Sequence, residues 1–385
     1  MKQRRVLFLG GTAIQIPILR LARARGLYII TCDNRPDNPG HALSDEYHNV
    51  SITDPEAVFQ LARSLDVDAV VCYVLEAGVQ SAAYACEKLG LPTSPYQSVR
   101  ILSNKRLFRQ FLSDNGFCVP RSFVCHSAEE GMSLMAKCLE DRSIALPVVV
   151  KPCDLWGSRG VTKVDDFSGF DDALRLALDC SRGSEIIVEE YVEADGSPVE
   201  GDGFAIDGQF AGHLWGDCFA DDKAVNPITP VGYYYPSAQP AERLARLDAE
   251  IQRLISLLGM RTNAYNIEAR FDRQGRVYLM EVAPRNGGNE IPLAIRHATG
   301  IDLMEGTLNA ALGESCESLR DARCDGRWVS YMVHSNEEGI FRGYDEKKPG
   351  QKLVEFVPYI KIGEKVHPYS GTNCQIGVAI YRIEE

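Results

Sequence analysis

Residues 146–161 read LPVVVKPCDLWGSRGV and bear most directly on the fold. The apolar run Leu146 to Val150 predicts a buried strand, and Lys151 follows it directly. A lysine at the end of a buried strand holds its charge at a fixed place, which suits phosphate oxygens. The glycine-bearing loop over residues 153–161 can then cover a phosphate with its backbone N–H groups. The stretch predicts a phosphate site, and because it lacks the Walker A pattern it is not a P-loop.

Two glutamates further along the chain form the second informative pattern. Glu268 and Glu281 each lie in a short strand-like run, and the turn between the runs predicts a hairpin. A buried carboxylate is costly unless it is paired or binds a cation, and Mg²⁺ accepts a couple of carboxylates together with phosphate oxygens. The pair therefore indicates a magnesium site. The alternative is two structural salt bridges, to Arg270 and Arg285.

The first hundred residues alternate short apolar runs with stretches of helical spacing. Such a βαβ pattern predicts a parallel sheet with right-handed crossovers, hence an open α/β domain. The expected strands are Val6 to Leu9, Tyr28 to Cys32 and Ala69 to Tyr73, and the expected helices are Ile14 to Arg25, Pro55 to Leu65 and Gly78 to Leu89.

The rest of the chain mixes helices with strands that are not regularly alternated. The stretch from about residue 191 to Pro240 reads as loop-rich, and the last seventy residues carry short strands with Gly-Glu and Pro-Gly turns. Further strands are expected at 146–150, 185–190, 264–271 and 276–282, and helices at 105–115, 170–180 and 241–258. The expected fold class is α/β and α+β, with a small β-rich region at the C-terminal end.

Composition and charge narrow the class of protein. The 385 residues are 45% hydrophobic and 24% charged, with no apolar run long enough to cross a bilayer, so no membrane role is expected. A formal net charge of −12 argues against a nucleic-acid partner and favours small-molecule substrates. The twelve cysteines form no CxxC pair, and the first apolar run stops at Gly10, too soon for a signal peptide. We expect reduced thiols and a cytoplasmic location.

A glycine turn near the N-terminus raises the question of a dinucleotide site. Gly10, Gly11 and Thr12 follow the first expected strand, and Asp33 ends the second. The full GxGxxG spacing is missing, so we interpret the turn as a tight connection or as part of an organic-substrate site. An NAD-dependent dehydrogenase is the corresponding alternative, and it is disfavoured.

Taken in their order along the chain, the motifs resemble those of the ATP-grasp superfamily. The resemblance covers essentially the whole chain. It implies a Rossmann-like domain over 1–100, an ATP-grasp domain over 101–315 with its lid at about 120–190, and a C-terminal β-rich subdomain over 316–385. Among the members, the carbamoyl-phosphate-synthase-like and amino-acid-ligase-like carboxylate-amine ligases are the most similar in pattern.

The resemblance also implies roles for individual residues. Lys105 and Lys151 would contact the phosphates of ATP. The residues of the phosphate-covering loop would be Trp156, Gly157, Ser158, Gly160 and Val161. The adenine hinge would be formed by Glu189, Glu190, Tyr191 and Val192, with Glu200 in the place of a ribose-binding acid.

The metal shell departs from the family pattern at one position. Glu268 and Glu281 match the ligands of Mg²⁺ or Mn²⁺, and Arg285 matches an arginine that stabilises phosphoryl or carboxylate charge. Many members carry an asparagine two residues after the second glutamate, where this chain has Ala283. Asn286 or a water molecule is then expected to complete the shell.

The implied activity is the ATP-dependent joining of a small-molecule carboxylate to an amine, or to a thiol, through an acyl phosphate, with ADP and phosphate released. Catalytic roles fall to Lys151 and Arg285. Phosphorylation of bicarbonate or carbamate is an alternative within the same fold, and a non-catalytic nucleotide-binding regulatory module is one from another class. A homodimer is a further expectation.

Overall fold

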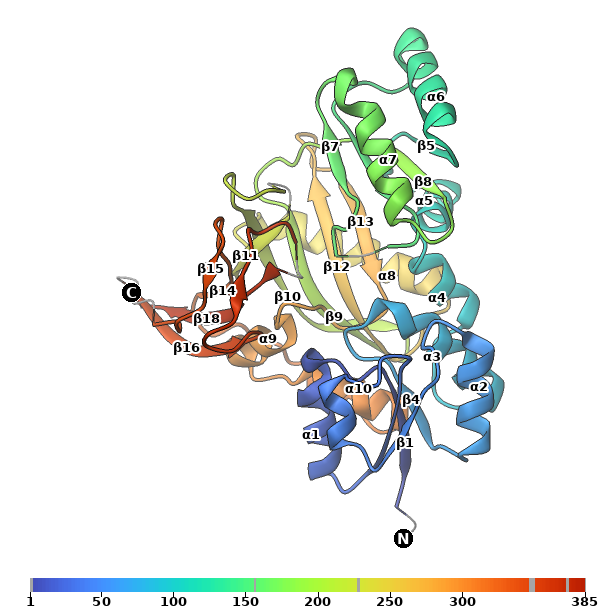
Figure 1. Ribbon diagram of the computed structural model, residues 1–385, viewed down its shortest axis with the longest axis vertical. Helices are drawn as coiled ribbons and strands as arrows, with labels where there is room; N and C mark the ends of the chain where they lie inside the picture. Colours follow the sequence, from blue (N-terminus) through green and yellow to red (C-terminus); the bar gives the residue numbers. More distant parts are fainter. Residues whose placement is uncertain (1–2, 156, 227–228, 346–349, 372–373, 385) are drawn as a thin grey trace.

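The computed structural model describes residues 3–155, 157–226, 229–345, 350–371 and 374–384. Its first part is a four-stranded parallel sheet with strand order β3-β2-β1-β4, at the blue end of the chain (Figure 1). The strands are β1 (Arg5–Leu9), β2 (Tyr28–Cys32), β3 (Glu46–His48) and β4 (Ala69–Val71), and the helices are α1 (Ile16–Ala24), α2 (Pro55–Ser64) and α3 (Glu76–Leu89), with short 3-10 helices η1 (Ala13–Gln15) and η2 (Pro39–Leu43). The expected parallel domain is confirmed.

The start of α2 shows why these helices begin where they do. The Asp54 side chain accepts a hydrogen bond from the backbone N–H of Ala57, and Pro55 occupies the first helical position. The apolar residues of α1 and α2 pack on the sheet, and one of its two cores is completed by Leu308 and Leu312 from a helix much later in the chain.

A second unit carries the first half of the candidate site. Two connecting helices, α4 (Tyr96–Leu102) and α5 (Lys105–Asp114), lead into a four-stranded antiparallel sheet with order β5-β8-β6-β7. Two helices pack against this sheet (Figure 1). The strands are β5 (Ser122–Cys125), β6 (Val148–Pro152), β7 (Thr162–Val164) and β8 (Ile186–Glu190), and the helices are α6 (Ala128–Asp141), η3 (Phe167–Gly169) and α7 (Phe170–Cys180).

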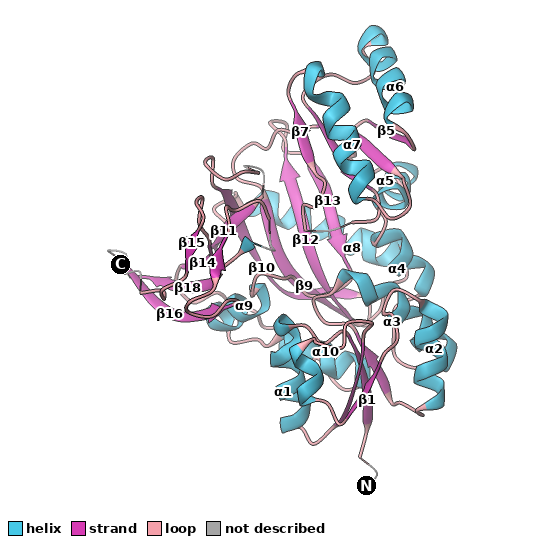
Figure 2. Ribbon diagram, viewed as in Figure 1, coloured by secondary structure: helices cyan, strands magenta, loops and turns pink. Residues whose placement is uncertain are grey.

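The centre of the molecule is an eight-stranded sheet with order β13-β12-β9-β10-β11-β14-β18-β16, whose strands stand out in Figure 2. Its strands are β9 (Val199–Ile206), β10 (Gln209–Ala220), β11 (Pro230–Tyr235), β12 (Asn263–Phe271), β13 (Val277–Ala283), β14 (Trp328–Val333), β16 (Gln351–Pro358) and β18 (Gly377–Ile383). The C-terminal region is β-rich, as expected, and its longer strands continue this sheet, while β15 (Gly339–Ile340) and β17 (Lys365–Val366) form a separate pair.

The expectation of a loop-rich stretch up to Pro240 is wrong, because β9, β10 and β11 lie there. Their sequences contain glycines and acids that normally favour turns. In the sheet the glycines make room: a Cβ on Gly201 would lie 2.2 Å from the Leu214 carbonyl oxygen, and one on Gly203 would lie 2.5 Å from the Phe210 ring. Close packing, not turn formation, accounts for these residues.

The two faces of the sheet are covered differently. One face of β9, β12 and β13 packs against α5 and α8 (Ala241–Leu257) in the largest apolar core. The other face packs in part against α9 (Ile291–Thr299) and also presents a row of acidic side chains. Helix α10 (Leu303–Leu312) and the 3-10 helix η4 (Glu317–Leu319) follow. None of the described helices is long and apolar enough to cross a membrane, and all twelve cysteines are free.

Candidate active site

Three carboxylates lie side by side across the central sheet. Glu268 on β12 stands opposite Glu200 on β9 and opposite Glu281 on β13, so all three side chains leave the same face of the sheet. Burial and their mutual repulsion shift the pKa values of these carboxylates. The surrounding protein and then the neighbouring carboxylates raise the pKa of Glu200 and Glu268, whereas Lys105 and Arg285 offset the same desolvation and hold the pKa of Glu281 below its usual range.

The salt-bridge interpretation of these glutamates finds no support among the described residues. The Arg270 guanidinium donates to the backbone oxygen of Val192 at 2.6 Å. Arg285 instead pairs with Glu76, with 2.8 Å between its Nε and the carboxylate. The glutamate row therefore keeps an excess of negative charge that these two arginines do not neutralise by contact.

Lys105 connects the row with the glycine loop. It opens α5, whose N-terminus is capped by the Asn104 side chain accepting from Leu107 N–H at 3.0 Å. Its ammonium lies 3.7 Å from a Glu281 oxygen and donates to the backbone oxygen of Leu155. Two motifs more than a hundred residues apart in sequence thus meet at one side chain.

Lys151 is buried at the end of β6 and forms an ion pair with Glu189 on β8. Arg109 on α5 binds the same carboxylate, with 2.6 Å from its Nε to Glu189 Oε1. Burial alone would raise the pKa of Glu189, but the two cations hold it at about 2. Burial lowers the pKa of Lys151, and Glu189 opposes that effect. The Glu189 side chain, expected at the adenine, is committed to these two cations instead.

The remainder of the expected hinge is also engaged within the protein. The Glu190 carboxylate pairs with Arg121, and Tyr191 N–H donates to the Pro147 carbonyl oxygen at 3.0 Å. The Tyr191 ring lies beneath the Lys163 ammonium and the Arg270 guanidinium, at 4.7 and 4.8 Å from its centroid. The adenine role of this segment stays a prediction.

The glycine loop follows β6 in a backbone conformation that suits a close approach. Gly157, Ser158 and Gly160 all have positive φ, of 66°, 57° and 68°. Val161 N–H donates to the Ser158 carbonyl oxygen at 3.4 Å. Trp156, which belongs to the expected loop, lies outside the described residues.

Arg285 lies at the junction between the first domain and the central sheet. Besides Glu76 at the start of α3, it donates to the Asn266 amide oxygen at 3.2 Å and to the Asn286 carbonyl oxygen at 3.0 Å. Asp202 supports the same loop by accepting from Gly287 N–H at 2.7 Å and from the Asn266 amide at 3.0 Å. Burial raises the pKa of Asp202 to about 7.

The structure gives the Asn286 side chain another partner than a metal. It is buried, and its amide oxygen accepts from the Thr307 hydroxyl of α10 at 2.6 Å. Ala283 pairs with Asn266 between β12 and β13, two residues along each strand from the Glu268–Glu281 pair. Completion of the metal shell by a water molecule remains the other expectation.

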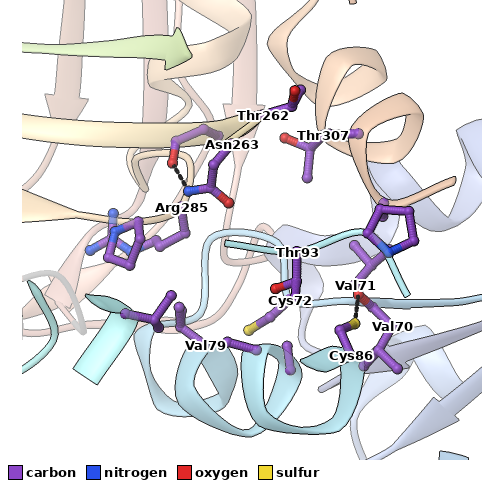
Figure 3. A pocket seen from close by; sticks show the side chains of 18 of the residues that line it. Val70, Val71, Cys72, Val79, Cys86, Thr93, Thr262, Asn263, Arg285 and Thr307 are labelled. Carbon is purple, nitrogen blue, oxygen red and sulfur yellow. Dashed lines mark hydrogen bonds between the residues drawn. The ribbon is translucent and has the colours of Figure 1, made fainter. Parts of the chain in front are cut away.

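A cavity of about 80 Å³ lies behind Arg285, between the first domain and the central sheet. In Figure 3 the side chains of Val79 and Cys86 on α3 face those of Asn263 and Thr307. Most of the residues that line it are apolar, and Asn263, Thr307 and Arg285 add polar surface. Because it sits where the two parts of the chain meet, the cavity marks the domain junction beside the arginine.

Four residues of the site were not expected from sequence: Arg109, Glu76, Asp202 and Asn266. One signal could have identified Arg109, because it lies four residues after Lys105 and so on the same face of α5. The others depend on contacts between distant segments that sequence spacing does not reveal.

Comparison with known proteins identifies the class. Residues 144–292 match the family model of the ATP-grasp domain. The ATP-grasp enzyme fsqD of Aspergillus fumigatus is 27% identical over 297 residues, which cover 69% of this chain and 48% of that protein. Residues 144–292 therefore match an ATP-grasp domain, which agrees with the resemblance of the motifs.

Solved structures agree on the fold. The L-amino acid ligase from Bacillus licheniformis aligns with a TM-score of 0.78 at 21% identity, covering 100% of this chain and 94% of that one. Phosphoribosylglycinamide synthetase from Anaerococcus prevotii gives 0.76 at 20% identity, covering 100% and 95%. By contrast, the chain spans about half the length of the first curated relatives it matches, between 48% and 53%.

The residues present fit a divalent cation bound together with ATP. Among the described residues, no group of three or more His, Cys, Asp or Glu side chains is gathered as a complete metal site. Glu268 and Glu281 offer two carboxylates in register, and Lys105 contacts only Glu281. That donor set suits Mg²⁺, which commonly takes one or two protein carboxylates and completes its shell with phosphate oxygens and water.

Proposed function

We propose that the chain is an ATP-dependent ligase that activates a small-molecule carboxylate and joins it to an amine. The observation that carries the proposal is the junction at Lys105, whose ammonium touches both the Glu281 carboxylate and the base of the glycine loop at Leu155. A cation-binding edge and a phosphate-covering loop at one point are what phosphoryl transfer from ATP requires.

The charge of each side chain indicates which ligand group it would bind. Glu268 and Glu281 would hold Mg²⁺, which neutralises phosphate charge when bound. Lys105 and Lys151 would bind phosphate oxygens, and the glycine loop would exclude water with its backbone N–H groups. Arg285 presents a guanidinium fixed on one side by Glu76 and on another by Asn266, so it is oriented before an anion arrives.

The reaction has two steps. A substrate carboxylate oxygen attacks the γ-phosphorus of ATP, and the bond from that phosphorus to the ADP oxygen breaks, giving an acyl phosphate. The amine nitrogen then attacks the acyl carbon, the carbon–oxygen bond to phosphate breaks, and the nitrogen loses a proton. Arg285 and Lys151 would stabilise the charge on the transferring group.

The test begins with binding and ends with isotope transfer. Mg-ATP should raise the thermal midpoint of the protein, whereas NAD should not. A panel of carboxylates, bicarbonate included, is then screened for ADP release with hydroxylamine present. An active acid should yield a hydroxamate, and oxygen-18 from its carboxylate should appear in phosphate.

The Glu281→Gln variant is the control, because it keeps the shape of the side chain and loses the charge that binds the cation. It should fold and lose turnover. Label that stays wholly in the product, together with AMP release, would replace the acyl phosphate by an adenylate. Stabilisation by Mg-ATP without turnover of any acid would favour a nucleotide-binding module.

A further inference from the structure

The pairing of β12 with β13 contains an irregularity directly beside the metal-binding glutamates. Glu268 pairs with Glu281, but the next residue, Ala269, pairs with Leu279, so Met280 has no partner. One extra residue on one strand of an antiparallel pair is a β-bulge.

The bulge decides which way Glu281 points. On β12 the residues that face the apolar core are Tyr265, Ile267, Ala269 and Phe271, in strict alternation. On β13 the core residues are Val277 and Leu279, and then Val282. The alternation is shifted by one position at the bulge. In a regular strand Glu281 would follow Leu279 on the core face, so the bulge places its carboxylate beside that of Glu268.

Arg109 holds the backbone at this bulge. Its guanidinium donates to the carbonyl oxygens of Met280 at 2.8 Å and Leu279 at 3.3 Å. On its other side it binds both oxygens of Glu189, at 2.6 and 3.4 Å. The side chain is only 4% exposed. A buried guanidinium is tolerated when its donors are satisfied, and here the planar fork spans two strands and a helix.

We propose that Arg109 is a positioning residue that fixes the Met280 bulge and thereby aims Glu281 at the cation. Glu189 anchors the guanidinium from the opposite side, which also links the bulge to Lys151. The inference rests on the proposed function, since it concerns how the cation site of that enzyme keeps its shape.

The experiment compares two arginines on the same helix. Arg109→Lys keeps a positive charge but replaces the fork by a single ammonium, whose three donors cannot serve both carbonyl oxygens and both oxygens of Glu189. Arg106→Lys is the matched control, because Arg106 lies one turn earlier and pairs with Glu185, at 2.7 Å, just before the same strand β8. The quantity measured is the Mg²⁺ concentration that gives half-maximal ATP binding. Calorimetric titration measures it.

Arg109→Lys should raise that concentration on the order of 10- to 100-fold, the usual effect of losing a residue that orients metal ligands. Arg106→Lys should leave it unchanged. In a Glu281→Gln background, Arg109→Lys should have no further effect on the Mg²⁺ requirement, because the carboxylate that it aims is already neutral.

Equal Mg²⁺ requirements for Arg109→Lys and Arg106→Lys would overturn the inference, as would a fully additive loss in the Glu281→Gln background. If Arg109→Lys does not fold, the neutral variant Arg109→Gln leaves Glu189 paired with Lys151 and should show the same loss. Failure of the unaltered protein to bind Mg-ATP would contradict the proposed function, not the role of Arg109.

Discussion

The charge of the Glu189 side chain is strongly tied to the folded state. Its pKa is about 2 in the fold, against 4.5 for an unperturbed glutamate, so the folded protein binds the proton more weakly. Its contribution to the free energy of unfolding is therefore present above pH 4.5 and is lost as the pH falls towards 2, by about 3 kcal/mol at most. Glu189→Gln should be less stable than the unaltered protein at pH 6, and the difference should shrink at pH 3. Urea unfolding at both values measures this, and a constant difference would contradict it.

The role of a single residue could be predicted from the sequence where its side-chain chemistry and its neighbours in the chain indicate the same function. Lys151 ends a buried strand and precedes glycines, so its role as a fixed charge could be predicted. The partners of that charge could not, because Arg109 and Glu189 are eighty residues apart and meet only in the fold. The contacts of the Glu189 side chain with Arg109 and Lys151 could not be predicted for the same reason.

The glycine loop allows a sharp test at the scale of one element. Gly160 has φ of +68°, and a Cβ there would lie 3.0 Å from the Cys180 Cβ and 3.1 Å from the Pro152 ring. Gly160→Ala should cost about 1 kcal/mol or more in unfolding free energy from the backbone conformation alone. It should also raise the KM for ATP, because the loop is displaced.

Gly169 provides the control within the same subdomain. No atom lies within 4 Å of its added Cβ, and its φ is −88°. Gly169→Ala should change stability by less than about 0.5 kcal/mol and leave the KM for ATP unaltered. If both variants behave alike, the strained loop has no special part in nucleotide binding.

Several elements followed from periodicity: α2, α7 and α8 begin and end within a residue or so of their expected bounds, whereas α4, α6, α9 and α10 were not expected. The failures in the central sheet have a common physical cause. Strand β9 reads VEGDGFAI, and local propensity favours turns there, but the glycines fit against neighbouring strands. The bulge at Met280 likewise depends on the pairing of β13 with β12, so the local sequence does not predict it.

For the whole molecule, the Glu76–Arg285 pair tests how the two main parts are joined. Both side chains are at least nine-tenths buried, and 209 residues separate them. Glu76→Gln leaves a buried guanidinium without its carboxylate, and losing one partner of such a pair costs about 3–5 kcal/mol. Chemical denaturation measures the loss.

Glu314, which follows α10 and pairs with both Arg4 and Arg25 of the first domain, is the comparison, because it lies at the surface, 39% exposed. Glu314→Gln should cost about 0–1 kcal/mol. Similar losses from both variants would mean that the buried pair is not the main tie across the junction.

The position of helix α10 in the chain determines when the first domain can finish folding during synthesis. Leu308 and Leu312 lie in the same apolar core as Val6, Phe8 and Ile18, although some three hundred residues separate them. During synthesis the first sheet leaves the ribosome long before this helix does. A nascent chain that ends near residue 100 carries an uncovered apolar face, so its first domain becomes a finished unit only after the ATP-grasp region has been made.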